Sequence, residues 1–405
     1  MKLQLKQLDK ILLYALYGAV AGVVLTQVLD LDKLTSIFFL LTFPLTVVLW
    51  LRTIMDGITK LDVFVVAIAI LACFNVLLNW VIFGGEFGFG YLKKLIMFIM
   101  TLLFFQVANR HTLRKEVIKV AYGLIDLLTV VMFLAYVLFT DAMHSIDGYL
   151  SPNLYLNFSN PNLTGLFLAC MYMLVLCRFF DAKSWKEQVF CGGIAVLQLW
   201  LLMETRARNS QLVVLLVTAA SIWLFFSKRS SFRMPKWVAV CISVFPLVFF
   251  LGYMTVVYSR LFNWMFSFMT GIEKSLTSRV RVWLPAMEGL LESPIIGAYS
   301  QTTGGTGSGQ MHNTLLELAA SYGLPLMLLM IGLFTIYLYQ NGRTYTKKSR
   351  FIGIITFAGA LTLGIGEGAM VSGSLGLHIL MGTFLMLARR PEIAEGLPNK
   401  PRTGE

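Results

Sequence analysis

Two pairs of arginines stand out in a chain that is otherwise strongly apolar. Arg206 and Arg208 occupy a short turn between two apolar runs, and Arg279 and Arg281 repeat the same spacing further along the chain. A guanidinium group stays charged at every physiological pH, and its planar fork matches two phosphate oxygens. The arginines are therefore candidate ligands for a phosphate-bearing substrate. The alternatives are headgroup binding or a salt bridge to Glu204 for the first pair, and a solvated helix face for the second.

A histidine at the mouth of an apolar run is the candidate base. His312 and Asn313 directly precede a run that begins at Leu315, so both lie at one end of an expected membrane span. A neutral imidazole, with its ordinary pKa of about 6.5, can accept a proton from a hydroxyl group. Nearby arginines would favour that neutral form. The alternative is a polar interface residue that only caps its helix.

Two further residues can complete such a site. Trp283 lies four residues after Arg279, in a segment that we expect to be helical from about Ser278 to Pro294. Its ring can orient the guanidinium group or stack on a sugar. Glu367 lies at the outer end of the penultimate expected span and is a candidate base or arginine partner, with a structural ion pair as the equal alternative.

Several kinds of chemistry have no support in the sequence. It contains no HExxH, GxSxG, Walker or GxGxxG pattern, and no acidic cluster with metal-ligand spacing. Its five cysteines lie in or beside apolar segments without the spacing of a zinc site or a disulfide framework. We therefore expect no metal and no cofactor.

Composition places the whole chain in a membrane. Hydrophobic residues make up 57% of its 405 residues and charged residues only 13%, with a mean hydropathy of +0.75. This length allows roughly a dozen spans of about 20 residues. The sequence predicts an all-α polytopic membrane protein with about 12 transmembrane helices, near residues 11–29, 34–51, 61–83, 92–108, 117–139, 162–180, 187–204, 209–227, 237–257, 313–339, 351–371 and 373–388.

The basic residues predict the orientation of the chain. Most of the 33 lysines and arginines fall on the side that holds the basic N-terminus, so their charge indicates topology and not nucleic-acid binding. We expect both termini in the cytoplasm and the candidate arginines outside. The expected organisation is a single transmembrane domain over residues 1–390, with a partly helical extracytoplasmic loop at 258–311 between spans 9 and 10, and a short cytoplasmic tail at 391–405.

An ordered set of motifs resembles a known family. Asn160-Pro161-Asn162-Leu163-Thr164-Gly165 is similar to an NPN-type entry to a span, and Thr205-Arg206 to a small-residue-Arg turn. Arg279-x3-Trp283 with Pro294-x2-Gly297 is similar to an outer-loop signature, and His312-Asn313 with Gly323 to an HN-x9-G motif. Together these motifs resemble the O-antigen polymerase and ligase superfamily. Tyr299, Leu326 and Pro285 depart from its pattern.

The resemblance implies a function and a set of roles. It implies a GT-C-like, metal-independent and inverting glycosyltransferase in the bacterial cytoplasmic membrane, acting at the extracytoplasmic face on a polyprenyl (undecaprenyl) diphosphate-linked oligosaccharide. It assigns catalysis to His312, Arg206 and Arg279. Binding of the diphosphate or sugar falls to Arg208, Arg281, Asn313, Trp283 and Glu367.

Several activities remain open from the sequence. A polymerase of surface polysaccharide would use a glycan acceptor, whereas a ligase would use a lipid A-core acceptor, and both share every motif named above. A flippase or secondary transporter would instead place charge at mid-membrane and show inverted repeats, and an assembly protein would explain hydropathy alone. Expected partners are membrane lipids and a chain-length regulator or flippase, but no nucleic acid.

Overall fold

The chain forms an all-α polytopic membrane protein. A computed structural model describes residues 2–83, 89–110, 114–146, 149–158, 160–229, 231–258, 283, 285–297, 313–342, 347–364 and 377–388. Its elements are α1 (Lys2–Val28), α2 (Asp32–Met55), α3 (Lys60–Phe83), α4 (Phe89–Arg110), α5 (Arg114–Leu138), α6 (Thr140–Met143), β1 (Ser145–Ile146), β2 (Tyr149–Leu150), α7 (Pro161–Asp181), α8 (Trp185–Thr205), α9 (Arg208–Phe226), α10 (Lys236–Tyr258), α14 (Thr314–Tyr322), α15 (Leu324–Asn341), α16 (Lys348–Leu363) and α17 (Leu377–Ala388).

Within the described ranges, eight helices are long and apolar enough to cross a membrane. They are α1, α2, α3, α5, α7, α8, α9 and α15, and each overlaps an expected span. Helices satisfy their own backbone hydrogen bonds, which is why they can cross lipid. Helices α4, α10, α16 and α17 also fall where the sequence predicts spans, although they do not meet the same length and composition criteria.

Two of the expected spans are wrong in their boundaries. The run 313–339 is not one helix, because it breaks at Gly323 into α14 and α15, and Pro325 lies in the first turn of α15. The run 351–371 ends as a helix at Leu363, with Gly364 as its C-cap. Both breaks depend on tertiary contacts that hydropathy does not encode.

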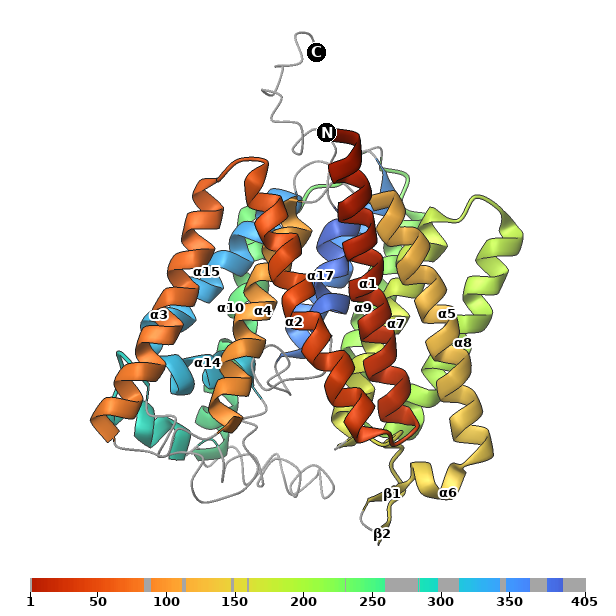
Figure 1. Cartoon of the computed structure of the whole chain (residues 1–405). Coiled ribbons are helices and arrows are strands. Elements are labelled where there is room, and N and C mark those ends of the chain that lie inside the picture. Colours follow the sequence, from red (N-terminus) through yellow and green to blue (C-terminus); the bar gives the residue numbers. More distant parts are fainter. Residues whose placement is uncertain are drawn as a thin grey trace.

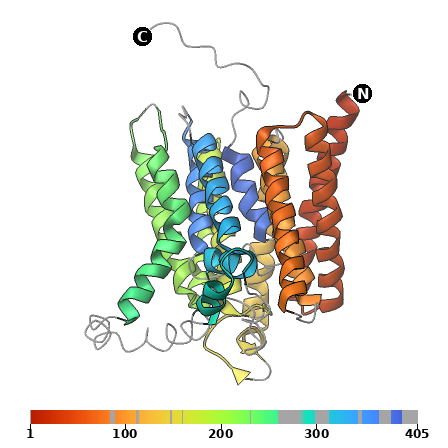
Figure 2. The ribbon, with the colours of Figure 1, turned by 90° about the vertical axis from the view of Figure 1, so that its left-hand side faces the viewer.

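The core lies around α17, which packs against α4, α5, α7 and α16. Every residue of α17 is buried, and most of α7 is too. By contrast, α2 and α3 expose large apolar side chains such as Leu40 and Val63, which are more than half exposed. An exposed apolar helix face is what a bilayer requires. Figures 1 and 2 show the helices side by side in one bundle.

The bundle has two ends that differ in their elements. We call the end where α1 begins and α2 and α4 end the N-side; in Figure 1 it lies at the top. We call the opposite end the far side, where α8 and α16 end and α7, α9 and α14 begin. The far side also carries α6 and the short antiparallel ladder in which Ser145 pairs with Leu150 and Ile146 with Tyr149.

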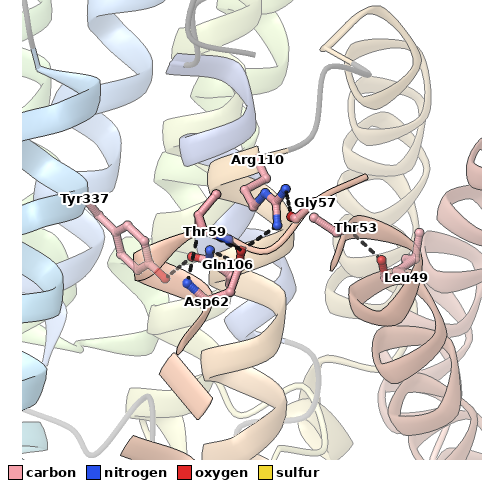
Figure 3. Close-up of polar contacts among 8 residues, drawn as sticks. All are labelled: Leu49, Thr53, Gly57, Thr59, Asp62, Gln106, Arg110 and Tyr337. Carbon is pink, nitrogen blue, oxygen red and sulfur yellow. Dashed lines mark hydrogen bonds and ion pairs between the residues drawn. The ribbon is translucent and has the colours of Figure 1, made fainter. Parts of the chain in front are cut away.

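A buried polar network joins α3, α4 and α15 on the N-side (Figure 3). Asp62 accepts hydrogen bonds from the backbone N–H and the hydroxyl of Thr59, both at 2.7 Å, which caps α3. It also accepts from Gln106 at 2.5 Å and pairs with Arg110 at 2.6 Å. Tyr337 donates to Gln106 at 3.1 Å. One carboxylate therefore fixes the start of α3 against two other helices.

We predict that Asp62→Ala destabilises the protein by about 3 to 5 kcal/mol, because removing one partner leaves the other charge of a buried pair uncompensated. The measurement is the midpoint of thermal unfolding in detergent micelles. Asp56→Ala is the matched control, because Asp56 is an exposed acid at the end of α2. Equal midpoints for the two variants would contradict the assignment of Asp62 as a structural anchor.

Candidate functional site

The turn that carries the first arginine pair lies between α8 and α9. Thr205 donates to the Leu202 carbonyl at 2.7 Å and accepts from the Ala207 N–H at 3.2 Å. Arg206 has a φ of +53°, in the left-handed region that non-glycine residues adopt at a cost. Both Arg206 and Arg208 are exposed. The threonine thus holds a tight turn that presents two guanidinium groups on the far side.

The start of α7 packs directly on this turn. Asn160 caps α7, since its side chain accepts from the Asn162 N–H at 2.6 Å, and Pro161 occupies the first helical turn. A methyl group at Gly165 would lie 2.4 Å from the Cβ of Ala207 and 3.2 Å from the Ser210 hydroxyl. The glycine therefore permits this approach, and the Asn160–Gly165 motif and the arginine turn form one contact.

The end of α16 links the arginine turn to the start of α14. Asn209, the residue after Arg208, donates to the Leu363 carbonyl at 2.8 Å. The next carbonyl, that of Gly364, accepts from the Thr314 N–H at 2.8 Å. A methyl group at Gly364 would lie 2.7 Å from the Thr314 hydroxyl. Two adjacent carbonyls at the end of α16 thus accept hydrogen bonds from the starts of α9 and α14.

Asn313 forms the N-cap of α14. Its side-chain oxygen accepts from the Leu316 N–H at 3.0 Å, and its amide donates to the Pro246 carbonyl of α10 at 3.0 Å. The residue is fully buried. The capping role considered for His312 therefore belongs to Asn313, and in this structure Asn313 positions α14 instead of facing an open surface.

A turn at 294–297 docks on the break between α14 and α15. Gly297 and Gly323 have φ values of +78° and +84°, which L side chains rarely adopt. A methyl group at Gly323 would lie 1.9 Å from the Ile295 carbonyl oxygen, and one at Gly297 would lie 2.5 Å from the Ala320 carbonyl oxygen. Both positions require glycine, and the Pro294-x2-Gly297 and HN-x9-G motifs meet here.

Two asparagines of α3, which the sequence analysis missed, hold the same turn. Asn75 donates to the Tyr322 carbonyl at 2.5 Å, and Asn79 donates to the Ile296 carbonyl at 2.7 Å. Both are buried in an apolar helix. Their position one helical turn apart in an expected span could have indicated this role, since buried polar groups in a membrane require hydrogen-bond partners.

Trp283 is a packing residue in this structure. Its ring is fully buried and meets Phe250 edge-on, with 5.1 Å between the ring centroids. It lies in a small cluster with Ala286, Leu316 and Ala320. The ring joins α10 and α14, and its stacking on a sugar stays a prediction. The helix expected in this loop is confirmed over residues 285–292 and ends before Pro294.

A buried ion pair near the start of α14 was also missed. Lys94 of α4 lies 3.7 Å from the Glu317 carboxylate, and both side chains are largely buried. Charged groups inside a membrane bundle are costly and usually carry structure or function. Glu317 lies one turn after Asn313, so this pair joins α4 to the helix that follows His312.

The described geometry defines a candidate anion-binding site on the far side. His312, Arg279, Arg281 and Glu367 lie outside the described residues. Among the residues that the structure does describe, neither Arg206 nor Arg208 forms an ion pair, so the alternative of a salt bridge to Glu204 is not realised. Exposed guanidinium groups without a carboxylate partner are available to an anionic ligand.

We predict that Gly323→Ala destabilises the protein by more than about 1 kcal/mol, because it adds a clash to an unfavourable φ. Gly332→Ala is the matched control, since a methyl group there meets nothing within 4 Å. The midpoint of thermal unfolding is measured for both. An unchanged midpoint for Gly323→Ala would show that the 294–297 turn does not dock on the helix break as described.

The chain was compared with protein families and with curated proteins. No protein-family model matches the chain, and no curated protein matches it. The likeness to the O-antigen polymerase and ligase superfamily therefore rests on the motif residues alone.

Proposed function

We propose that the chain is a membrane glycosyltransferase that polymerises surface polysaccharide, such as O-antigen, capsule or exopolysaccharide, from polyprenyl diphosphate-linked oligosaccharide. One observation carries the proposal. The motif segment at 160–165 packs on residues 207–210, which directly follow the Thr205-Arg206 motif, and the segment at 294–297 packs on the end of the segment at 313–323. Asn209 and Thr314 bind adjacent carbonyls, which brings the arginine turn near the second residue after His312.

The proposed reaction is a direct displacement at the anomeric carbon. The acceptor hydroxyl forms the new bond to that carbon as the bond to the diphosphate oxygen breaks. His312 takes the hydroxyl proton, and the lipid diphosphate leaves with the bonding electrons. Arg206 and Arg279, with Arg208 and Arg281, neutralise the charge that develops on the leaving group. Each charge-assisted hydrogen bond contributes roughly 1.5 to 3 kcal/mol.

The proposed topology follows the distribution of charge. We place the N-side in the cytoplasm, because short loops rich in lysine and arginine remain inside. Helices α4, α10, α16 and α17 join the eight span-length helices to give about twelve crossings, in a GT-C-like arrangement. The arginine turn then faces the outside of the bacterial cytoplasmic membrane, where lipid-linked glycans are assembled into polymer.

We predict that His312→Ala abolishes polymer formation while lipid-linked repeat units accumulate at the outer face, because the acceptor loses its base. Polymer length and the sidedness of the lipid-linked units are measured in cells. His144→Ala is the control, since His144 also lies on the far side, where its ring hydrogen-bonds the Thr140 carbonyl at 2.8 Å and lies 6.0 Å from the Tyr136 ring. Accumulation at the inner face would identify a flippase, and unchanged polymer would refute the role of His312.

We predict that Arg206→Gly lowers kcat/KM by roughly 10- to 150-fold, the equivalent of 1.5 to 3 kcal/mol. Glycine accepts the φ of +53° at this position, so the variant removes the guanidinium group and keeps the turn. Arg206→Lys retains the charge and should lose less. An unchanged kcat/KM in Arg206→Gly would exclude a role for this side chain at the diphosphate.

The assay uses purified full-length protein and a synthetic lipid-linked repeat unit. One arm contains the repeat unit alone, and a second adds a lipid A-core acceptor. Polymer in the first arm supports a polymerase, whereas transfer only in the second identifies a ligase, the alternative that shares the same motifs. Activity in both arms is expected to survive EDTA, because the proposed charge stabilisation comes from arginine.

A further inference from the structure

An apolar groove opens between α7, α8 and α9 near the N-side. It has a volume of about 260 Å³, and its walls include Val175, Phe179, Gly192, Ala195, Ile222 and Phe225. Two hydroxyls also line it, but they are engaged by α9 itself: Thr218 donates to the Val214 carbonyl at 2.6 Å, and Ser221 donates to the Val217 carbonyl at 2.7 Å. The groove therefore offers a ligand only apolar contact.

The position of this groove favours a hydrocarbon chain as its ligand. Large apolar side chains around it are exposed, including Phe190, Phe226 and Val189, as expected for a surface that faces lipid. A cavity of 150 Å³ holds a benzene molecule, so 260 Å³ holds roughly ten carbon atoms of a chain. The occupant must reach the groove from the bilayer and not from water.

Several cations lie in or beside the chain segments that flank the N-side end of the groove. Lys348 donates to the carbonyl of Phe225, a wall residue, at 2.7 Å, which fixes its ammonium group at the rim. Four exposed cations lie nearby in the sequence, namely Lys183 between α7 and α8, Lys186 in the first turn of α8, and Lys228 and Arg229 after α9. In the part of the chain that the structure describes, none of these four pairs with a carboxylate.

The carboxylates of this region are already engaged. Asp181 accepts from the Tyr122 hydroxyl at 3.1 Å. Glu187 accepts from the Lys183 backbone N–H at 3.1 Å and lies 3.9 Å from Arg178. Arg178 in turn pairs with Asp126 at 2.7 Å. The rim therefore keeps an excess of positive charge, which attracts anionic headgroups.

We propose that this groove is a binding site for an anionic phospholipid, with one acyl chain between α7, α8 and α9 and the phosphate beside Lys228, Arg229 and Lys348. Basic pockets between transmembrane helices are a recurrent way to bind such headgroups. The site lies on the opposite side of the bundle from the arginine turn, so the proposal does not depend on the proposed glycosyltransferase activity.

Two neighbouring glycines provide a matched pair of variants. A methyl group at Gly192 or at Gly193 would meet nothing within 4 Å, so neither position excludes a Cβ. Only Gly192 lines the groove. Gly192→Leu should therefore fill the groove, while Gly193→Leu adds the same side chain to the same helix outside it.

The experiment uses full-length protein in vesicles of phosphatidylcholine and phosphatidylglycerol. Either lipid carries a photoreactive acyl chain, and labelled peptides of α7, α8 and α9 are quantified. We expect the phosphatidylglycerol probe to label wild type and Gly193→Leu alike, with a severalfold loss in Gly192→Leu. Lys228→Gln combined with Arg229→Gln should lower its labelling by about fivefold for each charge removed, while phosphatidylcholine labelling stays constant.

Other outcomes would overturn the proposal. Equal labelling by the two lipids in wild type would mean that the groove contacts only bulk lipid. Unchanged labelling in Gly192→Leu would place the chain elsewhere. The double glutamine variant alters exposed loop residues, so it remains a test of headgroup binding even if Gly192→Leu fails to fold.

Discussion

The structure depends on the rule that every backbone polar group within a bilayer needs a partner in the protein. A continuous helix meets this rule by itself, but each break exposes carbonyl and N–H groups that other elements must satisfy. The chain breaks between α14 and α15, and there Asn75 and Asn79 donate to carbonyls on both sides of the contact. It also ends α16 early, and Asn209 and Thr314 bind the freed carbonyls. The hydrogen bonds that satisfy these broken helix ends therefore hold the elements of the far side together.

This requirement explains why several motif residues serve structure. The side-chain oxygen and nitrogen of Asn313 both hydrogen-bond to backbone groups. Trp283 packs in an apolar cluster between α10 and α14. Gly165, Gly297 and Gly323 allow elements to approach where a methyl group would clash. Motif residues of this kind fix the positions of the residues next to them in the sequence. In the proposed function, those neighbours are His312 and the arginines.

The sequence predicted what depends on local pattern. Apolar runs located the helices, and the Asn160-Pro161 pair marked the start of α7. It did not predict the break at Gly323, because that break depends on a contact with Ile295, nearly thirty positions earlier in the chain. For the same reason the pairing of Lys94 with Glu317, and of Asn79 with the 294–297 turn, could not be read from spacing. Hydropathy indicates how apolar a segment is, but it does not indicate which other segment packs against it.

Charge pairing separates two kinds of arginine in this chain. Three largely buried arginines near the N-side have a carboxylate that offsets their cost in an apolar bundle: Arg52 pairs with Asp9, Arg110 with Asp62 and Arg178 with Asp126. The exposed Arg229 at the same end has no such partner among the described residues. On the far side, Arg206 and Arg208 have no such partner among the described residues and lie exposed in a turn that includes a left-handed residue. Paired arginines hold helices together. In the proposed function, the partner of the exposed arginines is an anion from outside the chain, the diphosphate leaving group.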